Sequence, residues 1–207
     1  MNTRTTAALT ATALALTLTT ACTSTQPKAN LGTSPTPSAS PSPTGPPDPR
    51  FELPNDVKVT ISADTTGDSA KDEVLRYNGY HIMAVQEAMA GKGPTDPMLL
   101  KYVQDSSAVA HINELKDYKK RGLTLSGEFL FYDRKVTIKS SVLASVLFCE
   151  DQRNGYSKEL ATGKVRLTHP SKTDFIQHSS IVQKGSDGVW REISYLWKRG
   201  VEQCVRS

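Results

Sequence analysis

Residues 119–148 read KKRGLTLSGEFLFYDRKVTIKSSVLASVLF, and the spacing of their apolar side chains changes at Gly122. Upstream of this glycine, apolar residues recur every three or four positions, as on one face of a helix. Downstream they alternate with other residues, as in a strand that is buried on one face. The alternating residues are Leu123, Leu125, Phe129 and Phe131. The stretch therefore predicts a fold in which helices come first and strands follow.

Two further strands are predicted directly after this run. Val136 and Ile138 alternate beyond a turn that we place at residues 133–134. Residues 142–148 are nearly all apolar, which suits a central strand. We expect that strand to end in a solvated turn at residues 150–151.

The last two strands flank a predicted hairpin turn. Residues 185–188 read GSDG, and the segments on either side, 175–183 and 189–198, have the composition of strands. Trp190 and Trp197 lie on the second segment with an odd spacing. Because side chains alternate along a strand, this spacing predicts that the two indoles point to opposite faces of the sheet.

Two helices are predicted before residue 105. The first starts at residues 69–72 and stops at Gly91. The second has Asp96 at its cap and Pro97 in its first turn. The apolar residues that recur at helical spacing are Leu75, Ile82, Val85 and Met89 in the first helix, and Leu99, Leu100 and Val103 in the second.

A third helix is predicted to open at Ser106 or Ser107 and to end in the basic run 119–121, whose charges favour a helix C-terminus. Its expected inward residues are Val109, Ile112 and Leu115. A short edge strand at residues 57–61 precedes the helices. Three helices followed by four or five antiparallel strands make an α+β fold in which the helices cover the apolar face of the sheet.

The N-terminus has the pattern of a lipoprotein signal peptide. Residues 1–21 carry one charged side chain, Arg4, and are otherwise rich in Ala, Leu and Thr. Residues 18–22 read LTTAC and resemble a lipobox, although Thr19 stands where Leu is most common. We expect cleavage before Cys22 and acylation of its thiol, for example by palmitate. Cleavage without lipidation, which leaves a free thiol, is the alternative.

Residues 22–49 form the predicted anchor cysteine and linker. The stretch 1–49 holds eight of the 12 prolines, and the linker is rich in Ser and Thr without any apolar period. Such a segment cannot bury enough area to order itself, and as a coil it spans roughly 30 Å. Residues 50–207 then form one domain. The net charge of the chain, +4, is too small to favour a nucleic-acid partner.

The three cysteines suit an oxidising, extracytoplasmic location. If Cys22 carries lipid, Cys149 and Cys204 remain as a pair, and disulfides persist in that setting. We therefore predict a disulfide between these two residues. Two buried free thiols are the alternative.

Candidates for acid–base chemistry lie on the third helix. His111, Leu115 and Tyr118 share one helix face, and a His close to a Tyr can transfer protons. A purely hydrogen-bonded histidine is the alternative, because nothing in the sequence identifies an aspartate partner. The other candidates are Tyr77, Tyr80, His81, Asp105, His178 and Tyr195. The histidines fit no metal motif, and neither a nucleophile elbow nor a phosphate loop is present, so no metal and no cofactor are expected.

The chain resembles the nuclear-transport-factor-2-like (NTF2-like, also called SnoaL-like) domain of actinobacterial surface lipoproteins of unknown role. The resemblance rests on the lipobox, the linker, and the order of the segments RGLT at 121–124, FCED at 148–151, TGKV at 162–165, GVW at 188–190, and Cys204. It implies a cone in which N-terminal helices pack on a curved antiparallel sheet. It also implies an extracytoplasmic location and a bridge from Cys149 to Cys204, but no reaction.

We therefore expect a non-catalytic binding or assembly module of the cell envelope, anchored to the outer face of the membrane by lipid. Its expected partners are an envelope protein, a wall component or a small apolar ligand. The alternative is an isomerase- or dehydratase-type enzyme that uses His111 or Tyr118 as acid or base in the pocket of the cone.

Overall fold

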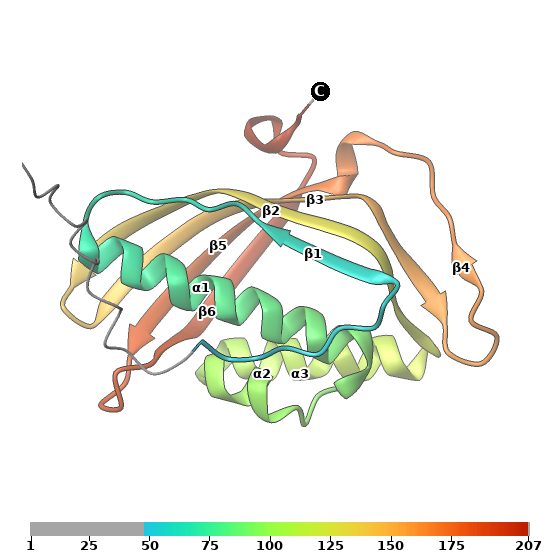
Figure 1. Cartoon of the computed structure of the whole chain (residues 1–207), viewed down its shortest axis with the longest axis horizontal. Helices are drawn as coiled ribbons and strands as arrows, with labels where there is room; N and C mark the ends of the chain where they lie inside the picture. Colours follow the sequence, from blue (N-terminus) through green and yellow to red (C-terminus); the bar gives the residue numbers. More distant parts are fainter. Residues whose placement is uncertain (1–47, 207) are drawn as a thin grey trace, which may run out of the picture. The chain divides into compact units, whose positions relative to one another are not determined.

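The computed structural model describes residues 48–206 (Figure 1). The predicted signal peptide, the anchor Cys22 and the linker up to residue 47 lie outside the described residues. Within the described part, no helix combines the length and apolarity needed to cross a membrane. The helical segments are α1 (Ser69–Glu87), a π-helical turn (Ala88–Lys92), α2 (Pro97–Tyr102), α3 (Asp105–Lys120), and short 3₁₀ turns at Lys172–Asp174 and Glu202–Cys204. The strands are β1 (Val57–Ile61), β2 (Leu123–Ser140), β3 (Leu143–Glu159), β4 (Val165–Arg166), β5 (Phe175–Lys184) and β6 (Trp190–Arg199).

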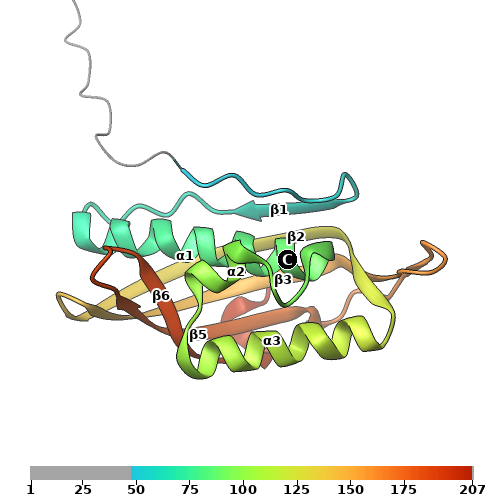
Figure 2. The same cartoon turned by 90° about the horizontal axis from the view of Figure 1, so that it is seen from below.

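The strands form one sheet in the order β1, β2, β3, β5, β6, and the short β4 pairs with β3. Neighbouring strands are antiparallel except for β1, which runs parallel to β2 at the edge. Helices α1 and α3 each contact both β2 and β6, so the sheet curves around the helices (Figures 1 and 2). The structure confirms an α+β fold with N-terminal helices packed on a curved antiparallel sheet.

Aspartates cap the first two helices. The Asp68 side chain accepts hydrogen bonds from the amides of Ala70 and Lys71 at the start of α1. Asp96 accepts from the amide of Met98 at 3.0 Å and precedes a proline at the first position of α2, as predicted. These caps satisfy amides that have no partner inside the helix. The two helix starts are therefore fixed by local sequence.

Helix α3 turns a more polar face inward than predicted. Val109 is 60 % exposed, so the prediction that it packs inward is wrong. The buried residues of this helix are Ser107, His111 and Leu115. Ser107 and His111 bond to the side chain of Glu192 on β6. The buried face of α3 is therefore not marked by apolar residues alone.

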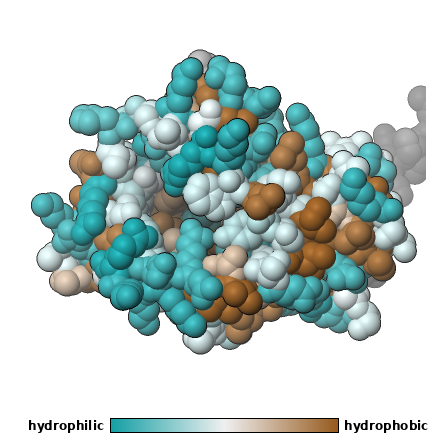
Figure 3. Space-filling view, turned by 180° about the vertical axis from the view of Figure 1, so that it is seen from behind, coloured by the Kyte–Doolittle hydropathy of each residue, from teal (hydrophilic) through white to brown (hydrophobic). Residues whose placement is uncertain are grey.

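The main hydrophobic core lies between α1 and the concave face of the sheet. Val74 and Ile82 pack with Phe131, Phe148 and other residues of the strands, and full burial of one such side chain stabilises the fold by about 1.5–3 kcal/mol. Seen from behind, the molecule has a mostly hydrophilic and neutral surface with apolar residues in small groups (Figure 3).

Strand β2 is continuous, and the predicted turn at residues 133–134 is wrong. A register irregularity between Tyr132 and Lys135 inserts one extra residue, with Asp133 at φ 51°. This bulge explains why the inward apolar residues switch from odd to even positions. It also buries Arg134, whose guanidinium bonds to the Asp64 carboxylate and to two backbone carbonyls.

Strand β3 also continues where a solvated turn was predicted. Glu150 and Asp151 lie in the middle of the strand, paired with both β2 and β5. Glu150 is buried on the concave face, and Asp151 forms an ion pair with Arg153. The prediction failed because each acid has a partner in the sheet. Glu150 bonds to His178 of β5, which is remote in sequence, and Asp151 pairs with Arg153, two residues further along the same strand.

The hairpin at residues 185–188 forms as predicted, but the two tryptophans share a face. The register of β6 against β5 shifts by one residue at Ile193. Trp190 is buried in the core, and Trp197 lines the same concave side at 53 % exposure. The prediction of opposite faces is therefore wrong, because one bulged residue reverses the alternation.

Cys149 and Cys204 form a disulfide in this structure, with their Cα atoms 5.5 Å apart. The bridge joins β3 to the C-terminal 3₁₀ turn, which lies on the side of the sheet away from the helices (Figure 1). Tyr132 and Phe175 complete a small cluster around it. The bridge thus closes the C-terminus over the convex face, remote from the concave side.

Candidate functional site

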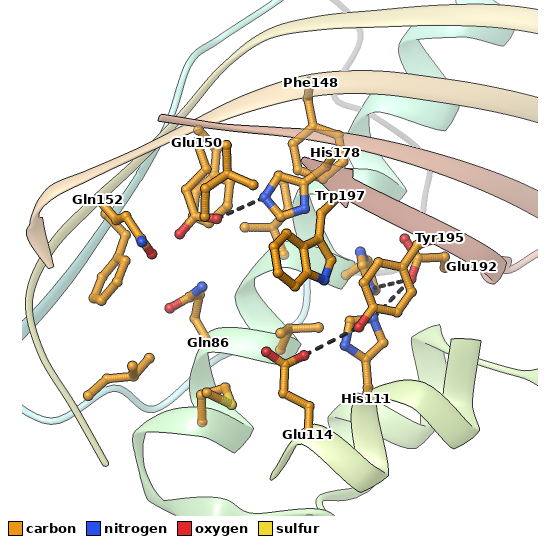
Figure 4. Close-up of a pocket in the computed structure, with 18 of the residues that line it drawn as sticks. Gln86, His111, Glu114, Phe148, Glu150, Gln152, His178, Glu192, Tyr195 and Trp197 are labelled. Carbon is orange, nitrogen blue, oxygen red and sulfur yellow. Dashed lines mark hydrogen bonds and ion pairs between the residues drawn. The ribbon is translucent and has the colours of Figure 1, made fainter. Parts of the chain in front are cut away.

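A cavity of about 160 Å³, here called the inner cavity, lies between α1, α3 and the concave face of the sheet (Figure 4). Part of its wall is apolar, formed by Ile82, Leu125, Phe129, Phe131, Phe148 and Trp197. Another part carries titratable side chains: His81, His111, Glu150, His178 and Glu192. This wall suits a compound that has an apolar body and a few polar groups.

Glu192 of β6 is a buried carboxylate in this wall, with 2 % of its surface exposed. The Ser107 hydroxyl donates to Oε1 at 2.5 Å, and Nε2 of His111 lies 2.9 Å from the same oxygen. The Ser180 hydroxyl donates to Oε2. Nε2 of His81 lies 3.4 Å from Oε1 but has no hydrogen-bond partner among the described residues. A buried charge requires such partners, and two serines and a histidine supply them here.

These contacts also set the protonation of the cluster. Burial alone would raise the pKa of Glu192, but the attraction of His81 in its protonated form and the hydrogen bonds from His111 and Ser107 outweigh burial and hold that pKa below its ordinary value. Burial lowers the pKa of His81, and the nearby carboxylate only partly opposes this effect. At neutral pH the cluster therefore contains an ionised Glu192 beside a neutral His81.

Tyr195 holds the ring of His111 in place. The two rings stack with their centroids 4.3 Å apart and their planes 1° from parallel. The Tyr195 hydroxyl donates to Glu114 of α3 at 3.3 Å (Figure 4). Burial, together with the Glu114 carboxylate, raises the pKa of Tyr195, so this hydroxyl stays protonated over the physiological range. His111 is thus fixed both by stacking and by its bond to the sheet.

A second histidine–carboxylate pair lies in another part of the wall. Nε2 of His178 on β5 lies 2.8 Å from Oε2 of Glu150 on β3. The imidazole stacks on Phe148 with centroids 4.7 Å apart. Figure 4 shows this pair and the Trp197 indole lining the same space as Glu192. The inner cavity therefore presents two polar positions separated by aromatic surface.

A second hollow of about 530 Å³, here called the outer hollow, adjoins the inner cavity. The residues that line both are Met89, Glu114, Leu125, Phe129, Gln152 and Arg199. Tyr118 lies here, with its hydroxyl 2.6 Å from that of Ser157. The hollow is the more polar of the two and connects the inner cavity with the end of α3.

The structure brings together four of the predicted candidates and separates the others. His81, His111, His178 and Tyr195 line the inner cavity. Tyr118 lines the outer hollow and not the inner cavity, so the predicted pairing of His111 with Tyr118 does not form. Tyr77 and Tyr80 pack against each other, and Asp105 is exposed at the start of α3. None of these three lines the inner cavity.

Two carboxylates of the site, Glu192 and Glu150, are not among the site residues predicted from the sequence. Glu192 lies two positions after the buried Trp190, and an acid at a core-facing strand position is a signal of a buried polar network. Glu150 follows the apolar run of β3 in the same alternation as Phe148. Both acids could be placed on the concave face from alternation alone, but their histidine partners could not.

Comparison with known proteins gives similarity to solved structures alone. No protein-family model matches the chain, and no curated protein sequence matches it. A ketosteroid isomerase-like protein from Erwinia carotovora atroseptica is 14% identical, with a TM-score of 0.43, over 61% of this chain and 92% of that one. A nuclear transport factor 2-like superfamily protein from Salmonella enterica is 10% identical, with a TM-score of 0.44, over 66% and 95%.

The intermembrane space region of the chloroplast protein ARC6 is 11% identical, with a TM-score of 0.43, over 66% of this chain and 98% of that one. The similar structures thus include a protein named after an enzyme and a region of an organelle protein.

Proposed function

We propose that residues 50–207 form a small-molecule-binding domain that is non-catalytic and is held at the outer face of the cell membrane. The observation that carries the proposal is the inner cavity, whose wall combines aromatic surface with buried, hydrogen-bonded polar groups. Known ligand sites have such concave, mostly apolar walls with a few polar groups in fixed positions.

The lining indicates the chemistry of the ligand. Phe148 and Trp197 offer flat apolar surface, while Glu150 and Glu192 accept hydrogen bonds and Gln86 can both donate and accept. The proposed ligand is therefore a compact compound with a ring or alkyl body and hydrogen-bonding groups. A strongly anionic compound is disfavoured near the buried carboxylates.

The location rests on the N-terminal sequence. In the proposal, Cys22 carries the lipid, and residues 23–49 hold the domain off the membrane, where it meets envelope compounds or proteins. A Cys22→Ala protein should move from the membrane fraction to the medium or the soluble fraction in fractionated cells. Retention in the membrane fraction at the wild-type level would contradict the lipid anchor.

The binding proposal is tested with a neutral aromatic probe, N-phenyl-1-naphthylamine, whose fluorescence rises in apolar surroundings. Wild-type protein should bind the probe saturably. Trp197→Ala should weaken binding roughly tenfold, because it removes aromatic contact worth about 1–2 kcal/mol. Leu196→Ala is the matched control, since Leu196 is the adjacent residue of β6 and is 75 % exposed. Equal binding by both variants, or no saturable binding, would contradict the proposal.

A second candidate function is acid–base catalysis on a small apolar substrate. The observation that favours it is the 2.9 Å contact between Nε2 of His111 and the ionised Glu192 in the cavity wall. A carboxylate beside an imidazole can hold it ready to accept a proton. The test is protein-dependent deuterium uptake next to the carbonyl of small cyclic ketones. Uptake that disappears in His111→Gln would support the enzyme, and its absence in wild-type protein would exclude this reaction for these ketones.

A further inference from the structure

Three side chains with metal-binding chemistry meet in the wall of the inner cavity. They come from three separate elements: His81 from α1, His111 from α3 and Glu192 from β6. Their donor atoms all lie within 4.8 Å of one another, and all three residues are buried. We propose that His81, His111 and Glu192 bind a divalent transition-metal ion, with Zn²⁺ as the preferred ion.

The spacing of the donor atoms fits such an ion. Zn²⁺ binds nitrogen and oxygen ligands at about 2.0–2.2 Å with tetrahedral geometry, which places neighbouring donors about 3.3 Å apart. Nε2 of His81 lies 3.4 Å from Oε1 of Glu192, and Nε2 of His111 lies 2.9 Å from the same atom. Both nitrogen–oxygen distances are thus within about 0.5 Å of the tetrahedral spacing, and all the donor atoms lie within 4.8 Å of one another.

The imidazole of His81 is an independent observation in favour of a ligand. It is 7 % exposed, and its Nε2 faces Oε1 of Glu192 without a hydrogen bond to any described residue. Buried polar atoms nearly always have a hydrogen-bond partner, so a buried nitrogen without one requires an explanation. A metal ion between Nε2 and Oε1 would satisfy it. Two histidines and a glutamate form a common ligand set for zinc.

The surroundings of the cluster already orient the proposed ligands. Ser107 and Ser180 donate hydrogen bonds to the two oxygens of Glu192, and Tyr195 stacks on His111. Such outer contacts fix the orientation of metal ligands and raise metal affinity. They would remain when the contacts of His81 and His111 to the carboxylate are replaced by bonds to the ion.

The site would leave one coordination position free toward the inner cavity, because all three residues line it. With two neutral imidazoles and one carboxylate, a bound Zn²⁺ would keep a net positive charge. That position would take water, or a carbonyl, hydroxyl or carboxylate oxygen of the cavity ligand. The inference goes beyond the proposed function, because the cavity can bind a compound with or without the ion.

The test uses untagged full-length protein that has been freed of metal with a chelator. Zn²⁺ titrated by calorimetry should bind with a stoichiometry of one. Glu192→Gln, which keeps the shape of the side chain, should lower the affinity by roughly 100-fold or more, beyond the 10–100-fold effect of outer contacts. His169→Gln is the control, because His169 is exposed and belongs neither to the cluster nor to the cavity lining, and this variant should bind Zn²⁺ like the wild type.

A spectroscopic measurement keeps the test valid if a variant fails to fold. Co²⁺ bound to the wild-type protein should give the intense visible absorption of a four- or five-coordinate ion, and X-ray absorption should detect two imidazoles around it. Absence of stoichiometric binding to folded wild-type protein would overturn the proposal and make the cluster a hydrogen-bond network only. Zn²⁺ binding by folded Glu192→Gln protein with the affinity of the wild type would also overturn the proposal.

Discussion

Arg134 is a buried cation that ties three segments together. Its side chain is 7 % exposed, and its guanidinium donates to the Asp64 carboxylate and to the carbonyls of Ser62 and Leu75. Burial lowers the pKa of the guanidinium, an effect that Asp64 opposes, but an arginine remains charged. This residue therefore fixes the segment after β1 and the start of α1 against the bulge in β2.

We predict that Arg134→Ala lowers the free energy of unfolding by roughly 2–4 kcal/mol, because it removes the guanidinium hydrogen bonds to one carboxylate and two carbonyls. Arg166→Ala is the matched control, since its side chain is 53% exposed and its pair with Glu159 should contribute less than about 1 kcal/mol. Urea unfolding followed by circular dichroism measures both. If the two substitutions lowered the free energy of unfolding by similar amounts, the role of Arg134 in holding the three segments together would be contradicted.

Gly155 is needed where β3 passes beneath the ring of Phe129. A Cβ at this position would lie 2.5 Å from Cε1 of that ring, so the ring must move. We predict that Gly155→Ala destabilises the fold by about 1–3 kcal/mol and weakens binding of the naphthylamine probe, since Phe129 lines the cavity.

Gly79→Ala is the control for this glycine substitution. Gly79 lies inside α1, and the nearest atom to an added Cβ is 3.6 Å away. Alanine is the better helix former by up to about 1 kcal/mol, so this variant should be as stable as wild type or more so. Thermal unfolding of both variants gives the comparison. A Gly155→Ala protein with unchanged stability and probe binding would rule out the steric account.

At the scale of elements, the bulges in β2 and β6 decide which side chains enter the cavity. The irregularity at Ile193 lets Trp190 and Glu192 face inward before it, and Tyr195 and Trp197 after it. Without the extra residue, strict alternation would keep only the first two on the concave side. The inward positions of Tyr195 and Trp197 thus depend on one inserted residue in β6.

The disulfide belongs to the opposite side of the sheet. Cys149 of β3 and Cys204 of the C-terminal turn are separated by 55 positions, and a loop of that length gives a stabilisation of about 4 kcal/mol in the chain-entropy model. We predict that Cys149→Ser with Cys204→Ser lowers the melting temperature by several degrees while probe affinity stays within about twofold. Calorimetry and fluorescence measure the two effects. Loss of probe binding by folded double-mutant protein would show that the bridge also shapes the cavity.

For the whole molecule, the sequence correctly predicted the features that depend on residues close together in the chain. The Asp96 cap, the GSDG hairpin and the change of period at Gly122 each depend on neighbours within a few residues, and all three mark the elements they predicted. The α+β order of helices before strands follows from the same local signals. Short-range physical rules are therefore sufficient to predict that the helices precede the main antiparallel strands.

The features that the sequence did not predict depend on contacts between remote residues. The bulges arise from the register between strands, which reverses the inward face after Tyr132 and again at Ile193. The cluster around Glu192 joins α1, α3 and β6, and no spacing within one element brings these residues together. Composition and periodicity could suggest His111, but only the fold supplies its carboxylate partner.

The central claim is that the inner cavity is a ligand site, and capture of a ligand from the native cells tests it most directly. Purified protein is incubated with a small-molecule extract of its own cells, separated from free compounds by gel filtration, and analysed by mass spectrometry. We predict that wild-type and Leu196→Ala proteins retain the same compound, which displaces the naphthylamine probe, and that Trp197→Ala does not retain it. Retention of no compound by folded wild-type protein, or equal retention by Trp197→Ala, would contradict the account.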